Sequence, residues 1–142
     1  MSKRDDFLKA EVAKVLRPGE TVTNTATVFT GNLLFASLFG VFGQLLMLTH
    51  HFAALTNQRL ILIQTGMGFS GVKTENRGVT SHEFADLEDV TPGGMMNQKS
   101  ITLKKRDGTS TKISFNTMVR QVEGQKAFAA EVVPKIQGAL RK

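Results

Sequence analysis

The chain carries a period-two pattern of apolar and polar residues near its beginning and in its middle. From Thr21 to Phe29, threonines alternate with small or apolar residues, which predicts a half-exposed β-strand. Two more strands are predicted over His51–Leu55 and Arg59–Gln64, joined by a turn at residues 56–58. The second of them is apolar at every position of Leu60–Ile63, as is typical of a strand that is covered on both faces.

Shorter strands are predicted further along the chain, over Val79–Phe84 and Leu87–Thr91. Pro92–Gly94 is expected to end them, and the glycine-rich run 66–78 before them is expected to be a loop. Because strands and helices do not alternate along the sequence, the strands are expected to be antiparallel.

The clearest local prediction is a β-hairpin from Ser100 to Phe115. A two-residue turn would pair Leu103 with Lys112 and turn the lysine inward. A three-residue loop, Arg106–Gly108, instead pairs Leu103 with Thr111 and keeps the apolar residues on one face. This register places the glycine of the loop at a position that requires a left-handed backbone.

Helices are predicted at both ends of the chain. Asp5 or Asp6 can cap a first helix that runs to about Leu16 and has an apolar stripe along one side. A second helix is predicted over Val119–Leu140, where apolar residues recur with helical spacing and Phe128 lies at the edge of the stripe.

Together these elements predict one mainly β domain that comprises residues 1–142. It has an N-terminal helix region (1–18), about seven antiparallel strands with an apolar insert (30–49) between the first two, and a C-terminal helix (119–141). Pro134 is expected to kink this last helix, because proline removes one backbone hydrogen bond.

Three short blocks and one hairpin carry a resemblance to a known family. Residues 16–20 read LRPGE, residues 54–62 read ALTNQRLIL and residues 84–90 read FADLEDV, before the hairpin Ile101–Phe115 and an alanine-rich helix. In this order they resemble the "LxxGE" segment, the "LTNxRLI" strand pair, the "IPLxDIxxV" strand and the last hairpin and helix of bacterial pleckstrin-homology-like (GRAM-like) domains. The resemblance spans roughly residues 16–141.

The resemblance implies a partly open β-barrel of two packed antiparallel sheets, capped at one end by the C-terminal helix. In that family the domain binds or assembles, in some members as an oligomer or beside a membrane, and does not catalyse a reaction. The resemblance to pleckstrin-type domains would imply a phosphoinositide site made of Lys and Arg on the first two strands. Residues 21–58 carry no charged side chain here. We therefore assign no lipid-headgroup ligands to this chain.

Composition narrows the range of partners and locations. The absence of cysteine removes disulfides, thiol catalysis and thiolate metal sites, and it fits a cytoplasmic protein. Asp5 and Asp6 stand where a secretory signal would have its apolar core. The net charge of +6 makes an anionic membrane surface a candidate partner, at the inner face of the membrane. Nucleic acid is not expected, because the chain has no Trp or Tyr to stack on bases.

No group of residues has the pattern of an active site. Gly66–Gly71 reads GMGFSG, but no helical pattern follows to hold a pyrophosphate, so a hairpin loop is expected. The adjacent His50 and His51 point to opposite faces of a strand and lack metal-ligand spacing. Asp86 and Glu88 would share a face of a regular strand, but nothing converges on them. We therefore expect no enzyme, no cofactor, no metal site and no small-molecule substrate.

Basic residues gather on the predicted last hairpin. The candidate anion contacts are Lys99, Lys104, Arg106 and Lys112. The same charges would also deter strand-to-strand aggregation, which is the competing interpretation.

The strongest functional signal is the charge-free segment from Leu33 to Leu48. As a helix it would be apolar almost all round, so it must be buried in something. Its sixteen residues are short for a bilayer-spanning helix, which needs about twenty, and it lacks charged or Trp/Tyr anchors. Burial in the protomer, burial against other copies and insertion into a lipid surface remain open. The expected contact residues are Leu34, Phe35, Leu38, Phe39, Phe42, Leu45 and Leu46.

These observations predict a non-catalytic binding or assembly module. It is expected to self-associate as a homo-oligomer, or to attach to a membrane surface, through residues 33–48. The alternative is a lipid- or anion-binding module that uses the basic hairpin 99–112.

Overall fold

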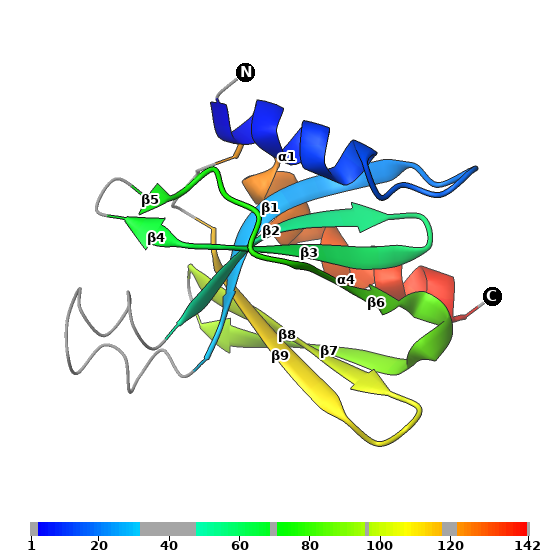
Figure 1. The fold of residues 1–142 in the computed structure, drawn as a ribbon. Helices are drawn as coiled ribbons and strands as arrows, with labels where there is room; N and C mark the ends of the chain where they lie inside the picture. The colour runs from blue at the N-terminus through cyan, green and yellow to red at the C-terminus, as the bar shows by residue number, and fades with distance from the viewer. Residues whose placement is uncertain (1–2, 32–47, 69–70, 96, 118–121, 142) are drawn as a thin grey trace.

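The chain folds into a bent antiparallel sheet with a helix on either side (Figure 1). The structure, a computed structural model, describes residues 3–31, 48–68, 71–95, 97–117 and 122–141. Its helices are α1 (Lys3–Ala13), the 3₁₀ turn η1 (Phe84–Asp86) and α4 (Gln125–Leu140). Its strands are β1 (Val22–Thr30), β2 (Thr49–Thr56), β3 (Arg59–Thr65), β4 (Met67–Gly68), β5 (Gly71–Val72), β6 (Val79–Glu83), β7 (Leu87–Met95), β8 (Gln98–Lys105) and β9 (Ser110–Asn116).

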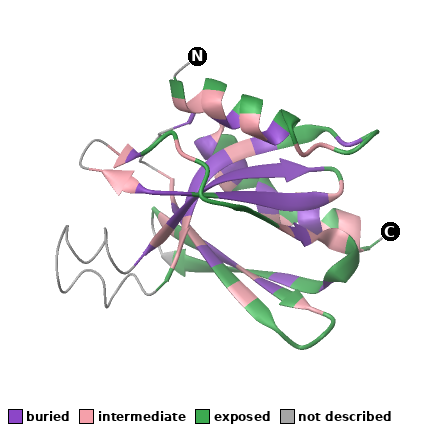
Figure 2. Cartoon of the chain, viewed as in Figure 1, coloured by how far each residue is buried: buried purple, intermediate pink, exposed green. Residues whose placement is uncertain are grey.

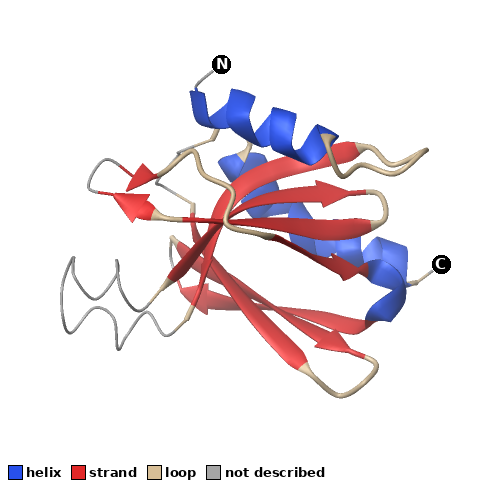
Figure 3. Cartoon of the chain, viewed as in Figure 1, coloured by secondary structure: helices blue, strands red, loops and turns tan. Residues whose placement is uncertain are grey.

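The seven longer strands form one sheet in the order β6-β3-β2-β1-β9-β8-β7. All of its pairs are antiparallel, and the sheet bends into two layers, as Figure 3 shows. The edge strands β6 and β7 are not paired with each other, so the barrel is partly open, and η1 links them at the opening. The predicted mainly β fold, a partly open antiparallel barrel with an N-terminal and a C-terminal helix, is confirmed.

Apolar side chains cover both faces of β2 and β3. Inside the barrel, residues of all the longer strands except β6 pack against Phe128, Val132 and Ile136 of α4. On the opposite face, α1 places Leu8 and Val12 over the alternate residues of β2 and β3. The two clusters explain why β3 is apolar at every position of 60–63, and why β2 and β3 form the most buried part of the sheet in Figure 2.

The helices differ from the prediction in detail. Phe128 is fully buried and stacks edge-on against Phe115 with ring centroids 5.3 Å apart, so its expected place at the edge of the stripe is wrong. The helix α1 ends at Ala13, before the predicted Leu16, and α4 starts at Gln125; the predicted start at Val119 lies outside the described residues. Pro134 lies inside α4, and the kink stays a prediction.

The strand β7 is longer than expected. It continues through Pro92–Gly94 to Met95 and pairs along its length with β8, so the prediction that these residues end the strand is wrong. A proline is tolerated there because β7 is an edge strand, on which a missing N–H need not break the ladder. The predicted loop 66–78 contains the small β4–β5 ladder, in which Met67 pairs with Val72.

The hairpin β8–β9 has the predicted register. Leu103 pairs with Thr111 and Ile101 with Ile113, and all three apolar residues among them are buried. Gly108 has a φ of +92°, the left-handed conformation that the three-residue loop requires.

We predict that Gly108→Val lowers the free energy of unfolding by ~1–2 kcal/mol, because a β-branched residue is strained at positive φ. Space is not the cause, since no atom lies within 4 Å of the position that a Cβ would take. Gly108→Asn is the matched control, since asparagine tolerates this conformation better. Urea unfolding measures both variants, and equal losses would contradict a backbone origin.

Candidate functional site

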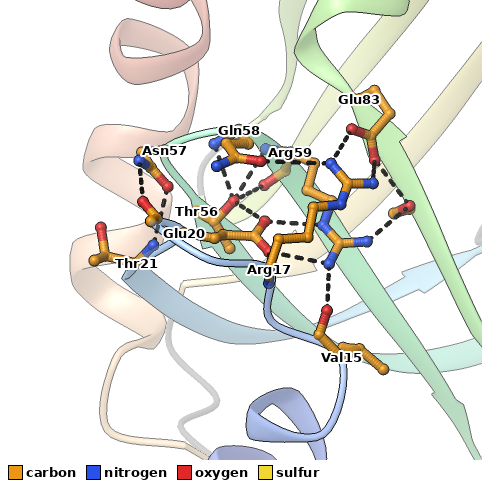
Figure 4. Close-up of polar contacts among 11 residues, drawn as sticks. Val15, Arg17, Glu20, Thr21, Thr56, Asn57, Gln58, Arg59 and Glu83 are labelled. Carbon is orange, nitrogen blue, oxygen red and sulfur yellow. Dashed lines mark hydrogen bonds and ion pairs between the residues drawn. The ribbon is translucent and has the colours of Figure 1, made fainter.

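Two of the sequence blocks that carry the family resemblance meet in a buried ion pair (Figure 4). Glu20 lies in the turn before β1, and Arg59 is the first residue of β3. Nε of Arg59 donates to Oε2 of Glu20 over 2.8 Å, and the second guanidinium nitrogen donates to Oε1 over 3.0 Å. That nitrogen also donates to the carbonyl of Val15, 2.7 Å away. The arginine therefore holds the end of the α1 segment, the start of β1 and the start of β3 together.

The turn between β2 and β3 is fastened to the same place. The Thr56 hydroxyl donates to Glu20 over 2.8 Å and accepts the backbone N–H groups of Gln58 and Arg59. The Asn57 side chain accepts the Thr21 N–H over 3.0 Å, and its amide donates to the Gly19 carbonyl. Thr56, Asn57 and Arg59 of the "LTNxRLI" block thus bind the "LxxGE" segment within the chain.

A second ion pair lies at the exposed edge of this cluster. Arg17 donates two hydrogen bonds, of 2.6 and 2.9 Å, to the two carboxylate oxygens of Glu83. The Arg17 side chain is 45% exposed, whereas that of Arg59 is only 8% exposed. The two pairs have similar geometry but differ in burial, and this difference decides how much each contributes to stability.

The charge state of the cluster suits a structural role. Hydrogen bonds from Arg59, together with those from Arg17 and Thr56, lower the pKa of Glu20 to about 2 against the opposing effect of burial. Arg17 likewise lowers the pKa of Glu83. Both carboxylates stay ionised at neutral pH and point at arginines, so neither is placed to exchange a proton with a substrate.

The structure distributes the predicted basic contacts along the β8–β9 hairpin. Lys104 and Lys112 lie on its outer face, at diagonal positions of neighbouring strands. Lys99 is five residues from Lys104, about 17 Å along β8, and Arg106 lies in the loop at the far end. Lys104 is paired across from Asp89 and lies 3.9 Å from Glu88, which reduces its positive field. The four residues are exposed, but they do not form one compact site.

The predicted self-association residues Leu34, Phe35, Leu38, Phe39, Phe42, Leu45 and Leu46 lie outside the described residues. What is described is the point at which the segment leaves and rejoins the sheet: Thr30 of β1 pairs with Thr49 of β2. Leu48, its last residue, is buried.

The acidic residues, the histidines and the glycine-rich run that the sequence offered as candidates are not arranged as a catalytic or metal site in the described residues. Asp86 lies in the 3₁₀ turn η1 and Glu88 in β7, so the regular strand on which they would share a face does not exist. In the described part of the chain, no three His, Asp or Glu side chains are grouped to hold a metal ion. The run 66–71 contains β4 and the first residue of β5, and residues 72–78 form no helix, as expected of a hairpin loop.

Two histidines are buried with a ring nitrogen that has no partner. His51 and His82 are 8% and 9% exposed, and the Nδ1 atom of each lacks a hydrogen bond. Burial, and to a lesser extent the neighbouring His50 and His82, lowers the pKa of His51 to about 4. His51 is therefore a buried core histidine whose Nδ1 is unsatisfied.

Sequence reasoning missed an apolar groove between α1 and the start of β1. It has a volume of about 500 Å³ and is lined mainly by Leu8, Val12 and Leu16 on one side and Val22 and Thr25 on the other. The individual residues gave no signal, because each fits an amphipathic helix or a half-exposed strand. Only the relative position of the two elements creates the groove.

Comparisons with known proteins support the fold. No protein-family profile and no curated protein matches the sequence. Among solved structures, the C-terminal domain of an unknown protein from Leishmania infantum is similar, with a TM-score of 0.54 and 12% identity over 93% of this chain and 96% of that one. The hSac2 domain from human phosphoinositide phosphatase Sac2 is similar with a TM-score of 0.53 and 12% identity, over 99% of this chain and 85% of that one.

At 12% identity, these likenesses concern the fold alone. Within the described residues, no helix has the length and apolar character needed to cross a bilayer. The architecture, a partly open antiparallel barrel whose C-terminal helix packs against β1, β7 and η1, resembles a pleckstrin-homology-like domain.

We predict that Arg59→Met lowers the free energy of unfolding by ~3–5 kcal/mol, because it leaves the buried Glu20 carboxylate without its partner. Arg17→Met, the matched control, should cost less than ~1 kcal/mol because that pair is exposed. The Arg59→Met effect should shrink as pH falls from 4.5 towards 2, where Glu20 becomes protonated in the folded state. Equal losses for the two arginines in urea unfolding would contradict the structural role of the buried pair.

We predict that His51 makes the protein less stable in mild acid. The folded state, with a pKa of about 4, binds the proton less readily than the unfolded state, whose value is near 6.5. The free energy of unfolding should therefore fall between pH 6.5 and 4, by up to ~3 kcal/mol from this residue. His51→Gln should remove that part of the slope, with pH 8 as the reference at which the residue is neutral in both states. An unchanged slope would refute the assignment.

Proposed function

We propose that this chain is a member of the bacterial pleckstrin-homology-like family that acts in the cytoplasm as a non-catalytic assembly module. It self-associates through residues 33–48 to form a homo-oligomer. The observation that carries the proposal is the register of β1 with β2, which continues to Thr30 and Thr49. A connection between such neighbours needs only about two to five residues, whereas eighteen separate these two.

The composition of the long connection supports a contact surface. It holds no charged side chain and three phenylalanines, at positions 35, 39 and 42. Exposing such a segment to water is costly, since each large apolar side chain gains ~1.5–3 kcal/mol on full burial. Association with other copies of the chain supplies that burial.

Self-association is favoured over membrane attachment by what flanks the segment. Interfacial membrane helices typically combine an apolar face with Lys or Arg and with Trp anchors. Residues 21–58 contain no charged side chain, and the whole chain contains no Trp or Tyr. The basic hairpin remains the second candidate surface, for an anionic lipid, but Glu88 and Asp89 beside Lys104 weaken it.

A binding role without catalysis is supported by how the charges of the described residues are used. Glu20 and Glu83 are ion-paired to arginines inside the fold. Asp89 lies on the exposed outer face of β7, opposite Lys104, and accepts the Val90 N–H. In the described part of the chain, the two ion pairs stabilise the fold, and the three carboxylates do not converge on a common cavity.

We predict that the triple variant Phe35→Ser, Phe39→Ser, Phe42→Ser yields a soluble, folded species of smaller mass. Three lost contacts of ~1.5–3 kcal/mol each are enough to dissociate an assembly, while the strand pairs of the barrel do not depend on them. Analytical ultracentrifugation measures the mass, and circular dichroism checks the fold. Replacing the same three residues by Leu is the control, and it should keep the assembly.

Three other results would contradict the proposal. Global unfolding of the serine variant would place the segment in the core of the protomer. An oligomer of unchanged mass would place the interface elsewhere. Loss of binding to liposomes without a change in mass would assign the segment to lipid.

A further inference from the structure

The groove lies between α1 and the first residues of β1, in the part of β1 that is not paired with β9 in the described residues. Among the described residues, β1 and β9 share one register pair, Phe29 with Ser114. Closer to the start of β1, the side chain of Gln125 makes the hydrogen bonds that a neighbouring strand would make. It accepts the Thr27 N–H over 2.7 Å and donates to the Thr27 carbonyl over 2.9 Å. The start of α4 approaches so closely that a Cβ on Gly124 would lie 2.6 Å from the Thr25 carbonyl oxygen. Beyond this point the first residues of β1 face α1 across the groove.

The walls of the groove are mainly apolar, with Asp5, Lys9 and Glu20 also among its lining residues, and its rim is accessible. Leu8 and Val12 form a buried floor, with exposures of 1% and 2%. Val22, at the rim, is 39% exposed, and Val79 on β6 is the other large apolar side chain of the described residues that is exposed to this extent. A hollow of about 500 Å³ with such walls favours an uncharged apolar occupant.

We infer that this groove receives residues 33–48 of a second copy of the chain, an inference that rests on the proposed function. The segment and the groove match in chemistry, since one lacks charged residues and the other has apolar walls. They lie at opposite ends of β1, because the segment is attached at Thr30 whereas the groove is lined by Val22 and Thr25.

The separation favours a second copy over the chain's own segment. Thr25 and Val22 are five and eight residues from Thr30, or about 17 and 26 Å along an extended strand. The eighteen-residue connection must return to Thr49 and so reaches only about 30 Å when fully extended, which leaves about two residues at the Val22 end of the groove, too few to fill it. Because the donating and receiving surfaces differ, the contact is heterologous and leads to a ring, a filament or a reciprocal pair.

The first test places a charge in the groove. Val22→Glu should reduce the mass of the assembly to that of the serine variant, while Val79→Glu, equally exposed but on β6, should leave it unchanged. Both substitutions are at the first residue of a strand, and circular dichroism checks that each variant is folded. Dissociation by both variants, or by neither, overturns the inference.

The second test is complementation. The triple Phe→Ser variant keeps an intact groove but has no apolar segment to insert into a partner. The Val22→Glu variant keeps the apolar segment but has a blocked groove. Mixed in equal amounts, the two should form a one-to-one complex of twice the monomer mass in sedimentation velocity. No complex in the mixture would mean that the segments contact each other or another surface, and would overturn the inference.

These outcomes separate the two proposals. If the serine variant itself keeps the full mass, the proposed function fails. If it dissociates while Val22→Glu does not, only the groove assignment fails. A small-molecule adduct in the native mass spectrum of the wild type that is absent from Val22→Glu would identify a lipid as the occupant and also overturn the assignment.

Discussion

The buried ion pair of Glu20 and Arg59 is the constraint on which the first layer of the sheet depends. Strand β3 is apolar at every position from 60 to 63, and both of its faces are covered. A shift of one residue would therefore exchange one apolar face for another, so burial alone specifies the register of β2 and β3 weakly. The two-pronged contact of Arg59 with Glu20, with Thr56 and Asn57 beside it, has one good geometry and supplies the missing specificity. A buried pair of this kind costs desolvation energy, and its best-attested use is in fixing register.

The cluster also shows what two of the sequence blocks do within this chain. The "LxxGE" and "LTNxRLI" blocks are far apart in sequence, but they supply the two partners of one ion pair and the side chains that support it. Within this chain, the two blocks therefore hold the end of the barrel at the start of β1 together.

Features with a local cause could be predicted from the sequence. The hairpin β8–β9 followed from alternation and from one glycine that needs a positive φ. The covered faces of β3 followed from its composition, but the sequence could not tell that α1 covers one of them. The burial of Phe128 and the length of β7 depend on contacts between distant segments, with Phe115 and with β8. The groove had no sequence signal, because it depends on how α1 lies against the start of β1.

Arg59 couples the start of β1 to the β2–β3 turn, and hydrogen exchange of the Arg59→Lys variant measures this coupling. Lysine keeps the charge but loses the two-pronged geometry. We expect amide protection to fall together in β1 near Asn24, in the turn at Thr56–Gln58 and at the start of β3, while β8 and β9 keep theirs. A loss of protection confined to the residues next to position 59 would show that Arg59 does not couple these segments.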